Sequence, residues 1–432
     1  MTNEQNNLVS LLKREGLPAL GCTGPTAYAL VTACCRPYMT APPQRLTMEL
    51  SPELFKTGFG VATPGSPEPG IAIAAANGLF GGDWTLGMEV LNTATPATNA
   101  QASDFIAARN LSILCDWSQR GIYARAVITT ENETIVSVLE GAYDHILSIT
   151  VNGHTVYSSD ALGEAESEKA ELDLGMLLSF VKTVDIDAIR FLQDGIDMNY
   201  ALAIEGIKNP FGHEVGRTLF RKACAGFDES FYADPASHIP ASACEWGMIL
   251  VTAAADARMG GSNMPAMCTM GDGNQGITAT IPVVKMAEFV KADDERLARA
   301  LILSHLGAIY IKSHYPSLSA FCGNTATSSA VAMALVYLNS GTFEQACMAI
   351  NNVISDTSGM VCDGAKSTCA MKVHTAAQSA YKGCFLALAG HGVAGQGIVS
   401  ADVEKTIDNL GAMITQGMHQ TDEKIIEIMR RN

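Results

Sequence analysis

One stretch of the sequence, residues 111–157, differs from the rest and most constrains the fold. It contains short runs rich in β-branched residues, such as YARAVITT, TIVSVLE and HILSITV, separated by Gly, Asn or charged residues. Such runs are typical of short β-strands, and Asn152-Gly153 is a dipeptide that favours a two-residue hairpin turn. We therefore predict four to five strands here, with one more strand at residues 45–50.

From residue 172 onward the sequence favours helices instead. Apolar periodicity predicts them at residues 172–184, 186–192, 241–257, 293–311, 325–338, 342–354 and 401–430. Asp293 or Asp294 would cap the helix that follows it. Shorter helices are expected at residues 5–15, 26–35 and 71–79. The polar, acidic segment 158–171 is a candidate boundary, so we predict an α+β protein with a mixed α/β domain at 1–160 and a larger, mainly helical domain at 161–432.

Composition narrows the class of protein. Of the 432 residues, 48% are hydrophobic, which is enough for a large buried core, and the net charge of −16 disfavours nucleic acid and anionic membranes as partners. The N-terminus lacks the apolar run of a signal peptide, and the longest apolar stretch, residues 326–338, is too short to span a bilayer. We expect a cytoplasmic protein whose twelve cysteines are thiols, not disulfides.

A glycine-rich motif, Gly271-Asp-Gly-Asn-Gln-Gly276, fits the G-x-G-x-x-G pattern of dinucleotide sites. That fingerprint needs a strand before it and a helix after it. Pro265 interrupts the preceding segment, and Pro282 with its β-branched neighbours does not open a helix. We interpret the motif as an irregular loop whose backbone N–H groups, with Asn274 and Gln275, hold a small anion such as a carboxylate. A tight turn between helices is the alternative.

Three of the cysteines form a candidate metal site. Cys362 and Cys369 lie seven positions apart in a glycine-containing segment, and Cys322 lies forty positions before Cys362. Three thiolates from two loops could hold three irons of a cubane cluster and leave the fourth iron open as a Lewis acid. By spacing alone, buried structural thiols remain an alternative, as does a zinc site with His374 as the fourth ligand.

Two further residues are candidates for chemistry. Cys22 directly precedes a predicted helix, whose N-terminus would stabilise a thiolate, so this cysteine is a candidate base or nucleophile; a plain buried thiol is the alternative. Arg258 could clamp a carboxylate, or it could form a structural pair with Asp256. Three histidines are interpreted as core or surface residues, namely His213, His305 and His314.

Taken together, the segments ALGCTGP, SAFCGN, ARMGG, GNQGITAT, DDERLARAL, SHLGAIYI, SGMVCDGAKSTCAMK and QTDEKIIEIM resemble the L-cysteine desulfidase family, which is distantly related to the iron–sulfur L-serine dehydratases. The similarity runs from about residue 17 to residue 429. It implies an oxygen-sensitive [4Fe–4S] lyase of cysteine catabolism that converts L-cysteine to pyruvate, ammonia and hydrogen sulfide.

The resemblance also implies roles for residues of this chain. Cys322, Cys362 and Cys369 match the family's cluster ligands, and Cys22 matches the cysteine thought to act as the base. The predicted substrate-binding residues are Thr23, Arg258, Asn274, Gln275 and Gly276. The expected partner is a small amino-acid substrate, with neither nucleic acid nor membrane, and the sequence leaves a homodimer open as the assembly.

The chain departs from the family at two positions. Gly24 stands where the family usually has Glu, and Asp272 adds a charge to a loop that usually reads GSGNQG. The first change puts substrate specificity and activity in question. The alternatives are therefore an L-serine dehydratase of the same mechanism and a non-catalytic, metal-binding relative. A cysteine-nucleophile hydrolase at Cys22 is disfavoured because no histidine has an obvious pairing role.

Overall fold

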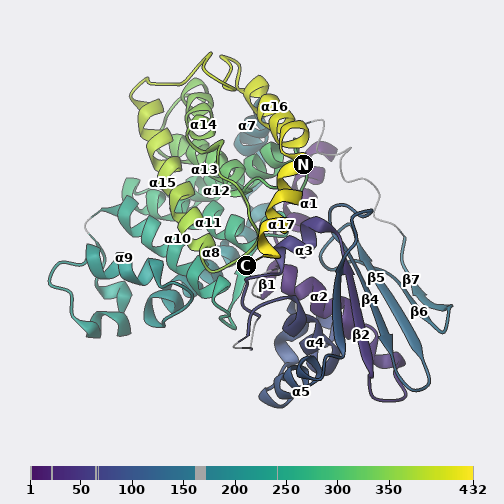
Figure 1. Ribbon diagram of the computed structural model, residues 1–432. Coiled ribbons are helices and arrows are strands. Elements are labelled where there is room, and N and C mark those ends of the chain that lie inside the picture. Colours follow the sequence, from purple (N-terminus) through teal and green to yellow (C-terminus); the bar gives the residue numbers. More distant parts are fainter. Residues whose placement is uncertain are drawn as a thin grey trace.

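The structure is a computed structural model that describes residues 2–20, 23–63, 66, 68–160, 172–240 and 242–431 (Figure 1). A sheet with helices on one side forms the lower right of Figure 1, and a larger group of helices fills the left and the top. The predicted α+β class, with a large and mostly helical region, is confirmed. The predicted division into domains at residue 160 stays a prediction, and most of the predicted linker, residues 161–171, lies outside the described part.

Six strands form the mixed sheet, in the order β3-β2-β4-β5-β6-β7. They are β2 (Arg45–Leu50), β3 (Leu111–Cys115), β4 (Tyr123–Thr129), β5 (Thr134–Glu140), β6 (Ile146–Val151) and β7 (His154–Ser158). Five strands, β3 to β7, thus lie where four to five were expected. Asn152 and Gly153 have φ values of 48° and 83°, which is the backbone that a two-residue hairpin needs.

One face of the sheet is covered by three helices, α2 (Thr23–Ala33), α4 (Ile71–Gly81) and α5 (Pro96–Ala107), and α3 (Pro52–Thr57) follows β2. Alternate residues of β2, namely Leu46, Met48 and Leu50, are fully buried in this core, as the period of a strand requires. The hydroxyl of Ser137 on β5 donates to the carbonyl of Val31 on α2. The sheet therefore fixes the position of α2.

The second region is mainly helical. Its helices are α7 (Leu174–Thr183), α8 (Phe191–Lys208), α9 (Val215–Ala223), α10 (Ala243–Met259), α11 (Gly273–Val290), α12 (Asp294–Lys312), α13 (Asn324–Leu338), α14 (Phe343–Thr357), α15 (Cys369–Leu388), α16 (Val403–Ala412) and α17 (His419–Met429). Asp293 caps α12, as predicted. The segment predicted as one helix at 401–430 is instead broken by a π-turn at Met413–Gly417.

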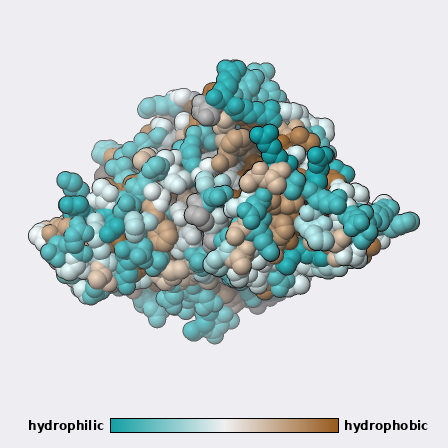
Figure 2. All heavy atoms as spheres, turned by 60° about the horizontal axis from the view of Figure 1, so that its bottom comes forward, coloured by the Kyte–Doolittle hydropathy of each residue, from teal (hydrophilic) through white to brown (hydrophobic). Residues whose placement is uncertain are grey.

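Helix α13 runs through the middle of this region and is buried on nearly every side. Its polar residues are tolerated there because they bond within the helix: Ser328 and Ser329 both donate to the carbonyl of Thr325, at 3.2 and 2.8 Å. Among the described residues, no helix is long and apolar enough to cross a membrane. In the space-filling view, hydrophobic residues show mainly toward the middle of the face, and its margins are largely hydrophilic (Figure 2).

The two ends of the chain each pack on the opposite region. Helix α1 (Asn3–Glu15) buries Leu8 and Leu12 in the core of the helical region. Helix α17 contacts α3, and its Ile426 joins the core beneath the sheet (Figure 1). Strand β1 (Pro18–Leu20) pairs antiparallel with β8 (Pro265–Met267) as a separate two-stranded ribbon. These three crossings bring loops of both regions together.

Candidate functional site

Two loops carry the three candidate cluster cysteines, and hydrogen bonds join these loops. The backbone N–H of Cys322 donates to the carbonyl of Met360 at 2.9 Å, and that of Cys362 donates to Ala320 at 2.8 Å. One loop enters α13, and the other enters α15, of which Cys369 is the first residue. The structure thus brings together loops that lie forty residues apart in the sequence.

The thiols lie within electrostatic reach of one another. Burial raises the pKa of the Cys322 thiol to about 12, and the thiols of Cys362 and Cys369 add to this rise. The backbone N–H of Asn324 and the ammonium of Lys372 act in the opposite direction. Cys322 and Cys369 lie at helix N-termini, and Lys372 interacts electrostatically with the thiols of Cys322 and Cys362. Helix N-termini and cationic side chains both favour thiolates.

A site for a single metal ion is not formed: within the described ranges, no three His, Cys, Asp or Glu side chains are arranged to hold one. His374, the fourth ligand of the zinc alternative, instead has its Nδ1 3.1 Å from Thr252 Oγ1 on α10. A cubane cluster spreads its ligands over separate irons and so needs thiols farther apart than a single ion does. The zinc alternative therefore gains no support from this arrangement.

Two buried polar atoms without hydrogen-bond partners among the described residues lie near the cysteine loops. The Tyr315 hydroxyl and the Asn324 side-chain oxygen are buried and find no hydrogen-bond partner in the described part of the chain, and Tyr315 interacts electrostatically with Cys322. Buried groups of this kind are costly to leave unpaired. A water molecule or a bound group at this place would satisfy them. Sequence reasoning missed both residues, although Asn324 stands two positions after Cys322.

The glycine-rich motif continues directly into helix α11, so the expectation that Pro282 prevents a helix here is wrong. The hydroxyls of Thr278 and Thr280 donate to the carbonyls of Asn274 and Gly276, both at 2.8 Å, and so these threonines are satisfied inside the helix. The helix is buried over most of its length, and this packing offsets the lost backbone hydrogen bond of the proline. Packing against the rest of the protein therefore determines the structure of this segment more strongly than Pro282 and its β-branched neighbours do.

The dinucleotide reading gains no support from this helix. Strand β8 precedes the motif, but it pairs only with β1, antiparallel, and so forms no parallel β-α-β unit in the described structure. Gly276 has a packing reason instead: a Cβ there would lie 1.9 Å from the carbonyl oxygen of Met267. Gly276 therefore allows α11 to approach β8 closely.

Arg258 and the start of α11 are linked by Asp272, the N-cap of that helix. The guanidinium of Arg258 is 3.3 Å from an Asp272 oxygen, and the Gln275 amide donates to the other oxygen at 3.2 Å. The alternative pair of Arg258 with Asp256 is not formed, because Asp256 accepts from the backbone of Gly216 at 2.7 Å. Asp272 is thus a site residue that binds protein groups on both sides.

The linked residues Arg258, Asp272 and Gln275 lie next to both cysteine loops. Gln275 lies against Gly323, where a Cβ would be 2.7 Å from its amide nitrogen, and it accepts from Thr327 at 3.2 Å. Met259, next to Arg258, packs in a small cluster with Cys369. The Asn274 side-chain oxygen is buried and has no partner within the described residues. The predicted substrate residues on α10 and α11 therefore adjoin the predicted cluster loops.

The first loop of the prediction is described only in part. Cys22 lies outside the described residues, and Thr23 is buried at the start of α2. At the departure from the family, a Cβ on Gly24 would lie 3.0 Å from the methyl carbon of Thr57 and 3.3 Å from the Tyr28 hydroxyl. These two side chains occupy the space that a larger residue at position 24 would need.

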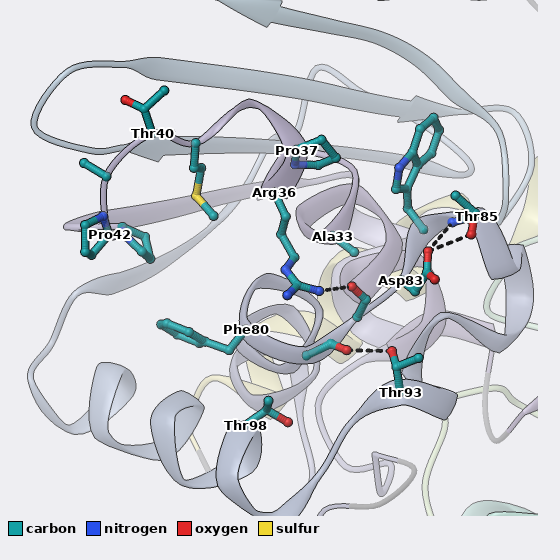
Figure 3. A pocket seen from close by; sticks show the side chains of 16 residues that line it. Ala33, Arg36, Pro37, Thr40, Pro42, Phe80, Asp83, Thr85, Thr93 and Thr98 are labelled. Carbon is teal, nitrogen blue, oxygen red and sulfur yellow. Dashed lines mark hydrogen bonds between the residues drawn. The ribbon is translucent and has the colours of Figure 1, made fainter.

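A cavity of about 990 Å³ lies elsewhere, in the sheet region (Figure 3). It opens between the segment at residues 36–43 and the end of α4, and no predicted site residue lines it. The Arg36 guanidinium reaches inward and donates to Gly82, and Thr93 donates to Gly81 at 2.6 Å (Figure 3). The polar groups of this cavity thus mainly hold the end of α4 in place by hydrogen bonds.

His305 lies beneath the glycine loop as a satisfied core residue. Its Nδ1 is 2.7 Å from the Thr269 hydroxyl and its Nε2 is 3.4 Å from the Thr280 hydroxyl. Burial lowers the pKa of His305 to about 4. The interpretation of His305 as a structural histidine fits these contacts, and His314 likewise faces the carbonyl of Tyr310, at 3.0 Å.

Replacing His305 by Asn should weaken the acid sensitivity of folding. Between about pH 6.5 and 4 the unfolded chain binds a proton at this position that the folded chain does not, so stability falls as the pH falls. In wild type this proton uptake lowers the free energy of unfolding by an amount on the order of 3 kcal/mol, and His305→Asn should abolish that decrease. Asp256, whose pKa burial raises to about 7, contributes the opposite slope in both proteins and cancels in the comparison. Urea unfolding at pH 7, 6, 5 and 4 measures the difference; parallel curves would contradict it.

Comparisons with known proteins identify relatives of this chain. Residues 85–427 match the family model of the serine dehydratase alpha chain. A UPF0597 protein of Aliivibrio salmonicida is 44% identical over 435 residues, covering 99% of this chain and 100% of the relative, and one of Shewanella baltica is 43% identical over 433 residues with the same coverage. A third, from Aliivibrio fischeri, is 43% identical over 427 residues, which cover 98% of each chain. This chain belongs to the serine dehydratase alpha chain family.

Proposed function

We propose that this chain is an iron–sulfur lyase that eliminates the β-substituent of a small L-amino acid, with L-cysteine as the substrate and pyruvate, ammonia and hydrogen sulfide as the products. The proposal rests on one observation above all. Two mutually bonded loops present Cys322, Cys362 and Cys369 beside Arg258 and the start of α11. Membership of the serine dehydratase alpha chain family supports the same class of reaction.

The charges next to the thiols suit an α-amino acid. Arg258, which is almost fully buried, and Asp272, which is partly exposed, stand 3.3 Å apart and present opposite charges. A zwitterionic substrate offers the complementary pair, its carboxylate toward Arg258 and its ammonium toward Asp272. The unpaired side-chain oxygen of Asn274 would accept a hydrogen bond from the substrate's ammonium.

The reaction itself needs a base and a stabilised leaving group. Bound by the three cysteines, a [4Fe–4S] cluster would supply an open iron as a Lewis acid toward the leaving thiolate or hydroxide. Cys22, as a thiolate, would take the proton from the substrate's Cα. Arg258 would hold the carboxylate, and Asn274 the ammonium, so that this proton faces the base. The enamine that is released tautomerises and hydrolyses to pyruvate and ammonia in water.

L-serine is the second candidate substrate, and the serine dehydratase family description favours it. The two reactions differ only in the leaving group, a thiolate or a hydroxide. Thiolate is the softer group and suits iron better than it suits a hard cation. The motifs of the first loop and of the cysteine loops resemble the desulfidases, which is why L-cysteine is preferred here.

Product analysis with both amino acids tests the proposal. Protein purified and reconstituted without oxygen should release sulfide and pyruvate in equal amounts from L-cysteine, and should turn over L-serine at least about tenfold more slowly, a difference of roughly 1.4 kcal/mol in transition-state stabilisation. Pyruvate from L-serine alone would make it a dehydratase. A fully loaded protein that forms no pyruvate from either amino acid would refute the lyase and leave a non-catalytic relative.

A further inference from the structure

A buried lysine connects the two cysteine loops to the C-terminal helix. Lys56 lies on α3, and its side chain is 2% exposed. Its ammonium donates to the carbonyl of Ser319 at 3.0 Å and to that of Cys362 at 3.1 Å, one on each cysteine loop. Its third partner is the carboxylate of Asp422 on α17. One side chain therefore contacts three segments that are more than 260 residues away in the sequence.

The backbone around Lys56 is fitted to the second cysteine loop as well. Gly364 has a φ of 98°, and a Cβ there would lie 2.5 Å from the carbonyl oxygen of Lys56. Three residues after α3 ends, Gly60 forms a parallel bridge with Lys366. Only glycine meets both the backbone and the space requirement at 364. The second cysteine loop thus packs closely against the backbone of α3 at Gly364, and the Lys56 ammonium binds the same loop at the carbonyl of Cys362.

The charge balance of this contact depends on Asp422. A buried ammonium is stable only when it is paired and fully hydrogen-bonded. The two loop carbonyls satisfy two of its three N–H groups, but they carry no net charge. Asp422 satisfies the third group and supplies the counter-charge. Without Asp422, Lys56 would have to leave the loop carbonyls and seek water.

We propose that Lys56 and Asp422 form a positioning pair that couples the docking of α17 to the arrangement of the two cysteine loops. The inference deepens the proposed function, on which it rests, because it names the residues that hold the cluster ligands in place. The coupling is reciprocal: whatever fixes the loops also favours the docked helix. Neither residue touches the substrate groups described above, so their role is in positioning and not in the chemical step.

Alkylation of the metal-free protein tests the pair without relying on a cluster. Wild type and Asp422→Asn are treated with iodoacetamide under anaerobic, reducing conditions, and the rates at Cys322 and Cys362 are read by mass spectrometry of the labelled peptides. In the variant, both rates should rise roughly tenfold or more because the loops open more often. After reconstitution, the variant should also lose iron to a chelator faster than wild type does.

Matched variants separate positioning from general stability. Asp422→Glu should restore slow alkylation, because it keeps the charge. Glu49→Gln breaks the Glu49–Arg125 pair on the sheet, 2.6 Å long, and should leave both rates unchanged. The double variant Lys56→Met/Asp422→Leu removes the buried charges, so it should fold well yet keep fast alkylation, since the loop carbonyls have lost their donor.

The outcomes are distinct. Wild-type rates at both cysteines in a folded Asp422→Asn protein would overturn the positioning pair, as would slow alkylation in the double variant. A wild-type protein that never takes up iron would defeat the proposed function, and the alkylation rates would still decide the inference about Lys56 and Asp422.

Discussion

Replacing Cys362 by alanine should abolish the visible absorbance of the reconstituted protein and its lyase activity together. Three thiolates are the fewest that can hold a cubane cluster while leaving one iron open. Loss of a direct ligand should cost more than the roughly 10- to 100-fold fall in metal affinity that follows loss of an outer hydrogen-bond partner. Anaerobic absorbance spectra, iron and sulfide analysis and pyruvate release measure the effect on one sample.

Another cysteine of the chain provides the control for that result. Cys347 is a half-buried thiol on α14, away from the two bonded loops, and Cys347→Ala should keep both cluster and activity. Circular dichroism of the Cys362→Ala protein should match wild type, because its loop is held by backbone hydrogen bonds as well. A Cys362→Ala protein with a full complement of iron would remove this residue from the ligand set.

Substituting Cys22 by serine should give the converse result, an intact cluster with little turnover. A positioned general base contributes about 10²- to 10⁴-fold to a reaction rate, and serine is a far weaker base than a thiolate. The expected fall is in kcat, with iron content and the visible spectrum unchanged. Single-turnover pyruvate formation under anaerobic conditions measures it.

The isotope effect of the substrate sharpens the Cys22 test. With L-cysteine deuterated at Cα, the variant should show a larger isotope effect than wild type if proton removal has become the slow step. A Cys22→Ser protein with wild-type turnover would exclude Cys22 as the base and leave the proton acceptor to another group.

The parts of the fold that were predicted correctly depend on local signals. Strand β2 has the bounds expected from its alternation, and the Asn152-Gly153 turn follows from the backbone preferences of those two residues. Helix α11 was missed for the opposite reason. A proline rule applies to an isolated segment, but this helix is surrounded by other helices that stabilise it around Pro282.

The site shows a similar limit. The cysteines and the residues of α10 and α11 were proposed from motifs, which are short and continuous. The partners of Arg258 and the role of Lys56 were not, because they are set by contacts between distant segments: Asp272 took the place expected for Asp256, and α3 carries no motif that points to the loops at 319 and 362. A single sequence without its fold holds no record of such pairs.

The exchange of chain ends between the two regions has a consequence for biosynthesis. Ile426 fills part of the core of the sheet region, whose last strand ends at Ser158. The nascent sheet region therefore leaves the ribosome with part of its apolar surface uncovered until the C-terminal helix has been made. Contacts of such long sequence separation also slow folding. Expression at low temperature or with a chaperone that shields exposed apolar surface should therefore raise the yield of this protein more than that of one whose regions close in order.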